Sequence, residues 1–470
     1  MHTCPPSDFL RGAAPRLKEA VDALSKRYDY ISVLGTDSFG ANYAATPGEL
    51  RAGDSNWVER GFVFRAQKDG VVAEHAFNEL PDGDLSETVR RALDPILAAA
   101  ASARRYPPLP DEPARQSWFG SVARDPFTAR PEDILELLSK ARNALSGSSA
   151  EIVYSGARAE FMRVAKLFLS PNRELEQAFM WAQTYVVAVG KRGDATKEDY
   201  RSFSGLKGLE LLDEVAEAVP DLATELVDML GAVPMEPGEY EVIMDPDVTG
   251  TLAHEAFGHG VETDMFVKGR AKAPEYLGKP VASPIVQMWD GAAGVEHCGS
   301  FLFDDEGRLA TKTRIIENGI LKSGISDLGS ALTLGVPPSG NGRRQAFDHK
   351  AYARMTNTYI DPGSSTFEDM LASIDHGWLL QKMNSGMEDP KNWGIQLVVM
   401  IGREIRAGKL TGKIASPVVC SGYVPDVLSA ITMISKDFEL SGSGYCGKGY
   451  KEFVKVSSGG PYVKTRMRLG

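Results

Sequence analysis

The stretch TLAHEAFGHGVETD, residues 251–264, is the part of the chain around which we expect the fold to be organised. It places two histidines, His254 and His259, on either side of a carboxylate, Glu255. Histidine is the commonest protein ligand of zinc and similar metals, and a carboxylate beside a ligand histidine is the arrangement that activates water for hydrolysis. The pattern therefore indicates a metal site with a general base.

The spacing of the two histidines differs from that of the familiar zinc-peptidase helix. In H-E-x-x-H the histidines are four residues apart and share one helix face, whereas His254 and His259 are five apart. On a regular helix, five steps of about 100° place the second histidine about 140° from the first, too far to share a metal. A local widening of the helix, with five-residue hydrogen bonds, would bring them together, and Gly258 would ease it. The alternative is an ordinary helix with one histidine in the core and one on the surface.

Two histidines do not complete a catalytic zinc site, which usually has three protein ligands and one open position. Cys446 is a distinctive candidate because it lies in the glycine-rich stretch GYCGKG. Flanking glycines let the backbone carry a thiolate close to a partner, and Lys448 would lower the pKa of the thiol. The alternative for Cys446 is a buried structural cysteine. Other candidate ligands are Glu262, Asp264, His297, Cys298, His349, His376 and the remaining cysteines.

Composition narrows the classes of function. A chain of 470 residues suits two or three domains. The net charge of -11 and the pI of about 5.3 argue against a nucleic-acid-binding face. No apolar run has the length of a membrane span, and the first residues lack the apolar core of a signal peptide. The four cysteines are scattered, so we expect a protein of the reducing cytoplasm without a membrane partner.

The order of the expected elements favours an α+β fold. Residues 1–104 predict an N-terminal α+β module, and the proline-rich residues 105–130 predict an extended crossing segment. Residues 131–230 predict a second α+β module with long strands. Residues 231–470 are rich in glycine turns, so we expect a C-terminal, mostly β domain that carries the metal-binding helix.

Three segments of the chain resemble the TldD/PmbA family of metallopeptidases. HEAFGH, from His254, matches the family's H-E-x-x-x-H motif. NGRRQAFDHKAYARMTNTYIDPG, from Asn341, resembles its Arg-Arg-Gln and Arg-Met-Thr-Asn-Thr-Tyr segment. GSGYCGKG, from Gly442, resembles its C-terminal Cys-Gly-Lys turn. The three occur in order after Gly231, whereas the first 230 residues match only in general layout.

The resemblance implies one Zn²⁺ per chain, with His254, His259 and Cys446 as ligands and Glu255 as general base. It also implies the metal-bearing, TldD-type member of the family. Such proteins form a homodimer, or a heterodimer with a related subunit, and enclose a cavity that admits unfolded or small peptides as substrates. We therefore expect a cytoplasmic zinc-dependent peptidase.

The chain departs from the family pattern at two places. MEDPKNWGIQ, residues 387–396, stands where many members have a Gly-Gln-Val-Asp stretch. After Cys-Gly-Lys the chain continues with Gly-Tyr-Lys, residues 449–451, where Glu-Gly-Gln is usual. Either segment could line the substrate cleft, so both bear on the choice of substrate.

Other functions stay open on the sequence. The same site could hydrolyse a small amide or a modified amino acid, or the chain could be a non-catalytic peptide-binding subunit. A purely structural metal is disfavoured, because structural zinc normally takes four protein ligands. Arg343, Arg344 and Arg354 are candidates for binding substrate carbonyls or a terminal carboxylate. A solvated loop or a dimer contact is the favoured alternative for these arginines.

Overall fold

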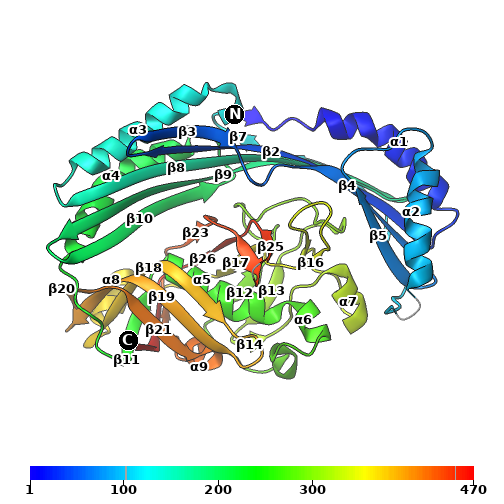
Figure 1. Cartoon of the computed structure of the whole chain (residues 1–470). Coiled ribbons are helices and arrows are strands. Elements are labelled where there is room, and N and C mark those ends of the chain that lie inside the picture. Colours follow the sequence, from blue (N-terminus) through cyan, green and yellow to red (C-terminus); the bar gives the residue numbers. More distant parts are fainter. Residues whose placement is uncertain (101–102, 450) are drawn as a thin grey trace.

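The structure is a computed structural model that describes residues 1–100, 103–449 and 451–470. A long curved sheet from the N-terminal half of the chain arches over the C-terminal half (Figure 1). Helices lie along the outer face of this arch, and its inner face packs on the C-terminal half. The α+β fold expected from the sequence is confirmed. Within the described residues, no helix combines the length and the apolar character that crossing a membrane requires.

The arch is a single sheet of eight strands. They are β2 (Tyr30–Thr46), β3 (Glu49–Asp54), β4 (Glu59–Lys68), β5 (Val71–Phe77), β6 (Ala114–Phe119), β8 (Ile152–Leu169), β9 (Arg173–Arg192) and β10 (Ala195–Gly205). The main path runs β10-β9-β8-β2-β4-β5, with β3 paired to β2 and β6 paired to β9. The long antiparallel ladder between β2 and β8 joins the strands before residue 104 to those after residue 131.

Four helices cover the arch: α1 (Asp8–Leu24), α2 (Leu85–Ala99), α3 (Pro131–Gly147) and α4 (Leu211–Met229). Successive residues of a strand point to opposite faces of a sheet, so a strand that is covered on both faces is apolar on both. In β8, Phe161 packs with residues of α3 and α4, whereas its neighbour Met162 packs on the inner face with Trp181 and Cys298. The long strands thus form one core with the helices and another with the C-terminal half.

The C-terminal half contains two larger sheets. The first has seven strands: β11 (Gly238–Met244), β18 (His376–Glu388), β19 (Gly394–Arg406), β20 (Lys409–Ala415), β21 (Val418–Tyr423), β22 (Met433–Ile434) and β27 (Val463–Leu469). It closes on itself, because β11 pairs with both β18 and β27. The second has six strands: β12 (Met288–Asp290), β13 (Thr313–Glu317), β14 (Ile320–Leu321), β17 (Asn357–Ile360), β23 (Glu439–Ser441) and β26 (Ser457–Gly460).

Short elements complete the chain. The two-stranded pairs are β1 (His2–Thr3) with β7 (Ser121–Val122), β15 (Gly342–Arg343) with β16 (Tyr352–Ala353), and β24 (Cys446–Lys448) with β25 (Lys451–Val454). The remaining α-helices are α5 (Pro246–Phe257), α6 (Thr263–Val267), α7 (Leu328–Leu334), α8 (Phe367–Ala372) and α9 (Val424–Ser429).

Helix α5 is buried and contacts strands of both larger sheets. Its start is encoded locally, because the carboxylate of Asp245 accepts a hydrogen bond from the amide of Val248 at 2.8 Å, and Pro246 occupies the first turn. A Cβ added at Gly250 would lie 2.4 Å from the amide nitrogen of Gly459 in β26. Glycine at position 250 therefore permits the close approach between α5 and β26.

Candidate metal centre

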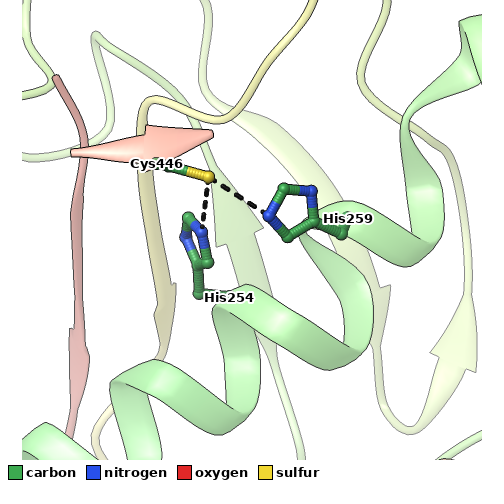
Figure 2. Close-up of side chains that lie close together, drawn as sticks. All are labelled: His254, His259 and Cys446. Atoms are coloured by element: carbon green, nitrogen blue, oxygen red, sulfur yellow. Dashed lines mark hydrogen bonds between the residues drawn. The ribbon is translucent and has the colours of Figure 1, made fainter. Parts of the chain in front are cut away.

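Three side chains from two distant parts of the chain converge at the end of α5 (Figure 2). His254 lies in the last turn of α5, His259 begins the 3-10 turn η2 (His259–Val261), and Cys446 begins β24. The Nε2 atom of each histidine lies 3.1 Å from Sγ of Cys446. Ligand atoms of the three residues all lie within 4.8 Å of one another. In the part of the chain that the structure describes, this is the one group of at least three His, Cys, Asp or Glu side chains arranged to hold a metal ion.

The end of α5 brings the two histidines together. The widened helical turn expected from the five-residue spacing is wrong: the amide of Gly258 donates to the carbonyl of His254 at 3.1 Å, as in a regular α-helix, and a 3-10 turn follows. A Cβ at Gly258 would lie 2.2 Å from that carbonyl oxygen. The helix therefore ends in a tight turn that only glycine allows, and this turn directs His259 back towards His254.

Charged groups around Cys446 favour its thiolate. Burial alone would raise the pKa of the thiol, but the charges and hydrogen bonds of His254 and His259 lower that pKa well below its usual value. Arg354, which has no exposed surface, donates from Nη2 to both Sγ and the carbonyl oxygen of Cys446, each at 2.9 Å. The thiolate is the form of cysteine that binds metals.

Glu262 joins the groups that lie behind the histidines. Its carboxylate lies 3.1 Å from Nε of Arg354, 2.6 Å from Nζ of Lys448 and 3.6 Å from Nδ1 of His259. Burial would raise the pKa of Glu262, but these positive groups, Lys448 foremost, lower it. Lys448, expected to act on the thiol, also pairs with Asp264 at 3.0 Å. The network orients the ring of His259 and keeps a buried negative charge beside it.

The donor atoms suit zinc. Zinc takes imidazole nitrogen at about 2.0–2.1 Å and thiolate sulfur at about 2.3 Å, so a tetrahedral site places nitrogen and sulfur about 3.5 Å apart. The two 3.1 Å distances are about 0.4 Å shorter than this value. Nδ1 of His254 is buried and has no hydrogen-bond partner among the described residues, so the polar contact of this ring is the one from Nε2 to Cys446. Three ligands would leave one position for water, as in catalytic sites.

A cavity of about 550 Å³ opens at the three candidate ligands. Glu255, the residue after His254, lines this cavity and has no ion-pair partner in the described part of the chain. Glu388, the last residue of β18, also lines it. The sequence had marked residues 387–396 as unusual, but no spacing pattern singled out Glu388 itself. The pairing of β18 with β19 brings it to the cavity at the candidate ligands.

The three arginines considered for substrate binding lie at different places. Arg354 is fully buried beside Cys446, one of the candidate ligands. Arg344 is buried and forms an ion pair with Glu74 of β5, in the arch. Arg343 donates to the carbonyl of Met355 at 2.8 Å, and burial lowers its pKa to about 10. A solvated loop is therefore wrong for Arg344 and Arg354, while a role in substrate binding stays a prediction.

Comparisons with known proteins identify the family of this chain. Residues 237–468 match the PmbA/TldA metallopeptidase C-terminal domain. A metalloprotease of Methanothermobacter thermautotrophicus is 30% identical over 73% of this chain and 75% of its own length. A zinc metalloprotease TldD homolog of Saccharolobus solfataricus is 31% identical over 64% of this chain and 67% of its own.

Solved structures share the fold. A protein from Thermotoga maritima covers 97% of this chain and 100% of its own with a TM-score of 0.80, and TldE from Thermococcus kodakarensis covers the same shares with a TM-score of 0.75. Each is 17% identical to this chain, so these two similarities concern the fold alone. The sequence relatives and the matched domain carry the assignment: the chain belongs to the TldD/PmbA family of metallopeptidases.

Proposed function

We propose that this chain is a zinc-dependent peptidase that hydrolyses small or unfolded peptides. In this proposal His254, His259 and Cys446 hold one zinc ion, and Glu255 is the general base. The observation that carries the proposal is the convergence of three ligand atoms at a cavity that Glu255 also lines. Membership of a metallopeptidase family, with relatives named metalloproteases, supports it.

Each residue of the proposed site has a separate role in catalysis. Zinc held by two imidazoles and a thiolate supplies the positive charge that polarises a peptide carbonyl and makes water more acidic. Glu255 accepts a proton from the attacking water and passes it to the leaving amine. Arg354 keeps Cys446 ionised, and Glu262 orients the ring of His259. A thiolate ligand donates more charge to zinc than a carboxylate ligand would, and this makes the zinc a weaker acid. Proton transfer by Glu255 is therefore more important here than in a site with a carboxylate ligand.

The test of this function separates metal binding from turnover. Wild type and Glu255→Gln are purified without added metal, zinc is measured by elemental analysis, and a pool of unfolded peptides is analysed by mass spectrometry after incubation. Both proteins should contain about one zinc per chain, and the variant should cleave about 10²- to 10⁴-fold more slowly. Full activity in Glu255→Gln would remove Glu255 from the mechanism. A wild type without zinc would contradict the proposal. Hydrolysis of small amides without cleavage of peptides would favour a small-amide hydrolase.

We also propose that the working form is a dimer, either of two copies or with a related subunit. The fold shared with TldE supports a partner of the same architecture. Sedimentation of the purified chain distinguishes the two cases. A dimer on its own indicates two copies, and a monomer indicates that the partner is a different chain.

A further inference from the structure

A row of solvent-accessible side chains crosses the closed seven-stranded sheet. Residues that lie directly opposite each other on antiparallel strands point to the same face. The strand register gives the row in the order Met387 of β18, Gln396 of β19, Ser421 of β21, Arg468 of β27 and Glu239 of β11. All five line one cavity of about 930 Å³. The row is therefore the floor of a groove, and we call this cavity the barrel groove.

The barrel groove lies on the outer face of the sheet and is open to solvent. Leu397, Cys420 and Leu469, each next to a member of the row in the chain, have at most 1% exposed surface. Successive residues of a strand point to opposite faces, so the row itself points outwards. Met387 has 70% of its surface exposed. A ligand from solution can therefore reach the floor of the groove.

One end of the barrel groove opens at the candidate metal centre. Met387 lines the barrel groove and also the cavity of about 550 Å³ that contains the three candidate ligands. Met387 and Gln396 are the two ends of the segment that departs from the family pattern in the sequence. A methionine side chain is apolar and flexible, so it suits contact with an apolar residue of varied shape. A peptide held at the metal ligands would leave the site over Met387.

Arg468 lies at a defined distance from that end. Three strand-to-strand steps separate Met387 from Arg468, and each step is about 4.8 Å, so the two lie about 14 Å apart along the sheet. An extended peptide rises about 3.3–3.4 Å per residue and covers this distance in about four residues. Residues i and i+4 of an extended chain point to the same side. The side chain four positions from the one over Met387 therefore meets Arg468.

The far end of the barrel groove has an excess of positive charge. Arg468 forms no ion pair with any described residue, and Glu239 lies opposite it with a carboxylate 4.0 Å from Nε of Arg466. Two guanidinium groups thus face one carboxylate. Arginine binds carboxylates through two parallel hydrogen bonds, so an acidic group is the ligand that this end suits.

The other acidic residues of the barrel groove do not neutralise Arg468. Asp389 lies in the turn after β18, where it accepts from the amide of Lys391, and Asp426 lies in α9. Both oxygens of Glu388 are buried and make no hydrogen bond with the residues that the structure describes. The acidic side chains thus lie on the turn and the helix beside the floor, and the arginines lie on β27.

We propose that the barrel groove binds the part of the peptide substrate that extends away from the metal, with an apolar residue over Met387 and an acidic side chain, four positions further on, at Arg468. This inference rests on the proposed peptidase function and adds a sequence preference to it. The acidic group is a side chain and not the terminal carboxylate of the peptide, because Arg466, Arg468 and Glu239 are exposed and leave this end open for the chain to continue.

Binding tests the barrel groove without depending on turnover. Zinc-loaded Glu255→Gln is titrated with fluorescent peptides that are blocked at both ends and carry leucine and glutamate four positions apart, in either order. Matched peptides carry glutamine or lysine in place of glutamate. In at least one order, glutamate should bind about 2- to 5-fold more tightly than glutamine, the range for an exposed ion pair. Equal affinities in both orders would overturn the proposal.

Charge reversal assigns the preference to one residue. Arg468→Glu, added to the same protein, should remove the preference for glutamate and make the lysine peptide the tighter ligand. The control Arg406→Glu changes an exposed arginine of β19 that does not line the barrel groove, and it should keep the original preference. An unchanged preference in Arg468→Glu would overturn the proposal.

Three further outcomes separate this groove from its rivals. A preference for a free terminal carboxylate over an internal glutamate would overturn the choice of ligand. If Arg468→Glu dissociates a dimer in sedimentation and leaves peptide affinity unchanged, the face is a contact between subunits and the proposal fails. With wild type, binding as expected without cleavage would contradict the peptidase function alone, and cleavage without any effect of glutamate would contradict the groove alone.

Discussion

Nε2 of His259 lies 3.1 Å from Sγ of Cys446, although 187 residues separate the two in the chain. His254 makes the same contact at the same distance from the end of α5. The hairpin of β24 and β25 must therefore be docked on α5 before three ligands exist. In the proposed function, metal binding therefore depends on the tertiary structure that docks this hairpin on α5.

Replacement of Cys446 should remove the metal. Cys446→Ala leaves two histidines, and we expect zinc affinity to fall by more than about 100-fold, since loss of even an outer hydrogen bond to a ligand costs 10- to 100-fold. Elemental analysis after dialysis against a weak chelator measures the effect. Cys420→Ala, which removes another buried sulfur from the core of β21, should keep its zinc. Full zinc in Cys446→Ala would exclude the thiolate as a ligand.

Gly258→Ala should separate the two histidines. The added Cβ would lie 2.2 Å from the carbonyl oxygen of His254, so the turn that carries His259 must shift. We expect zinc affinity to fall together with the unfolding temperature. Gly12→Ala provides the control, because nothing lies within 4 Å of a Cβ at this position in α1 and alanine favours a helix by about 0.5–1 kcal/mol. Unchanged zinc binding in Gly258→Ala would show that the turn tolerates a side chain.

Arg354→Met should destabilise the protein even without metal. The guanidinium has no exposed surface and neutralises both Glu262 and the thiolate of Cys446, so its loss leaves buried negative charge. Breaking a buried pair from one side costs about 3–5 kcal/mol, which urea unfolding of the metal-free protein would measure. Arg406→Met, at an arginine with a half-exposed side chain, should change stability by less than about 1 kcal/mol. Equal effects of the two substitutions would contradict this role.

His297 should make stability depend on pH below neutrality. Burial, aided by Lys455 and Lys207, lowers the pKa of its imidazole to about 4, from 6.5. Between these values the unfolded chain binds a proton that the folded chain does not, so stability falls as the pH decreases from about 6.5 to about 4.

Urea unfolding of the metal-free protein at several pH values measures this slope. His297→Gln cannot titrate, so the wild type should lose about 1–3 kcal/mol more than the variant between neutral pH and pH about 4. Parallel pH curves for the two proteins would mean that His297 is not held neutral by the fold.

Local signals in the sequence account for much of the fold. The cap at Asp245 and the proline after it start α5, and the glycine at 258 ends it. Apolar residues at helical spacing and in long alternating runs mark α1 to α4 and the strands of the arch, because helix and strand periodicities depend on neighbouring residues. The sequence by itself also placed His254, Glu255 and His259 on one short segment with metal-binding chemistry.

Only the tertiary structure decided what surrounds that segment. Spacing left several candidates for the third ligand, and the contact of Cys446 with both imidazoles depends on a hairpin from the far end of the chain. A solvated loop or a dimer contact was the favoured alternative for Arg354 on the sequence, yet Arg354 is fully buried. The unpartnered carboxyl group of Glu388 likewise follows from the register of β18 and β19. Burial and charge pairing are set by contacts between distant segments, so the chemistry of these side chains emerges only when the sheets have formed.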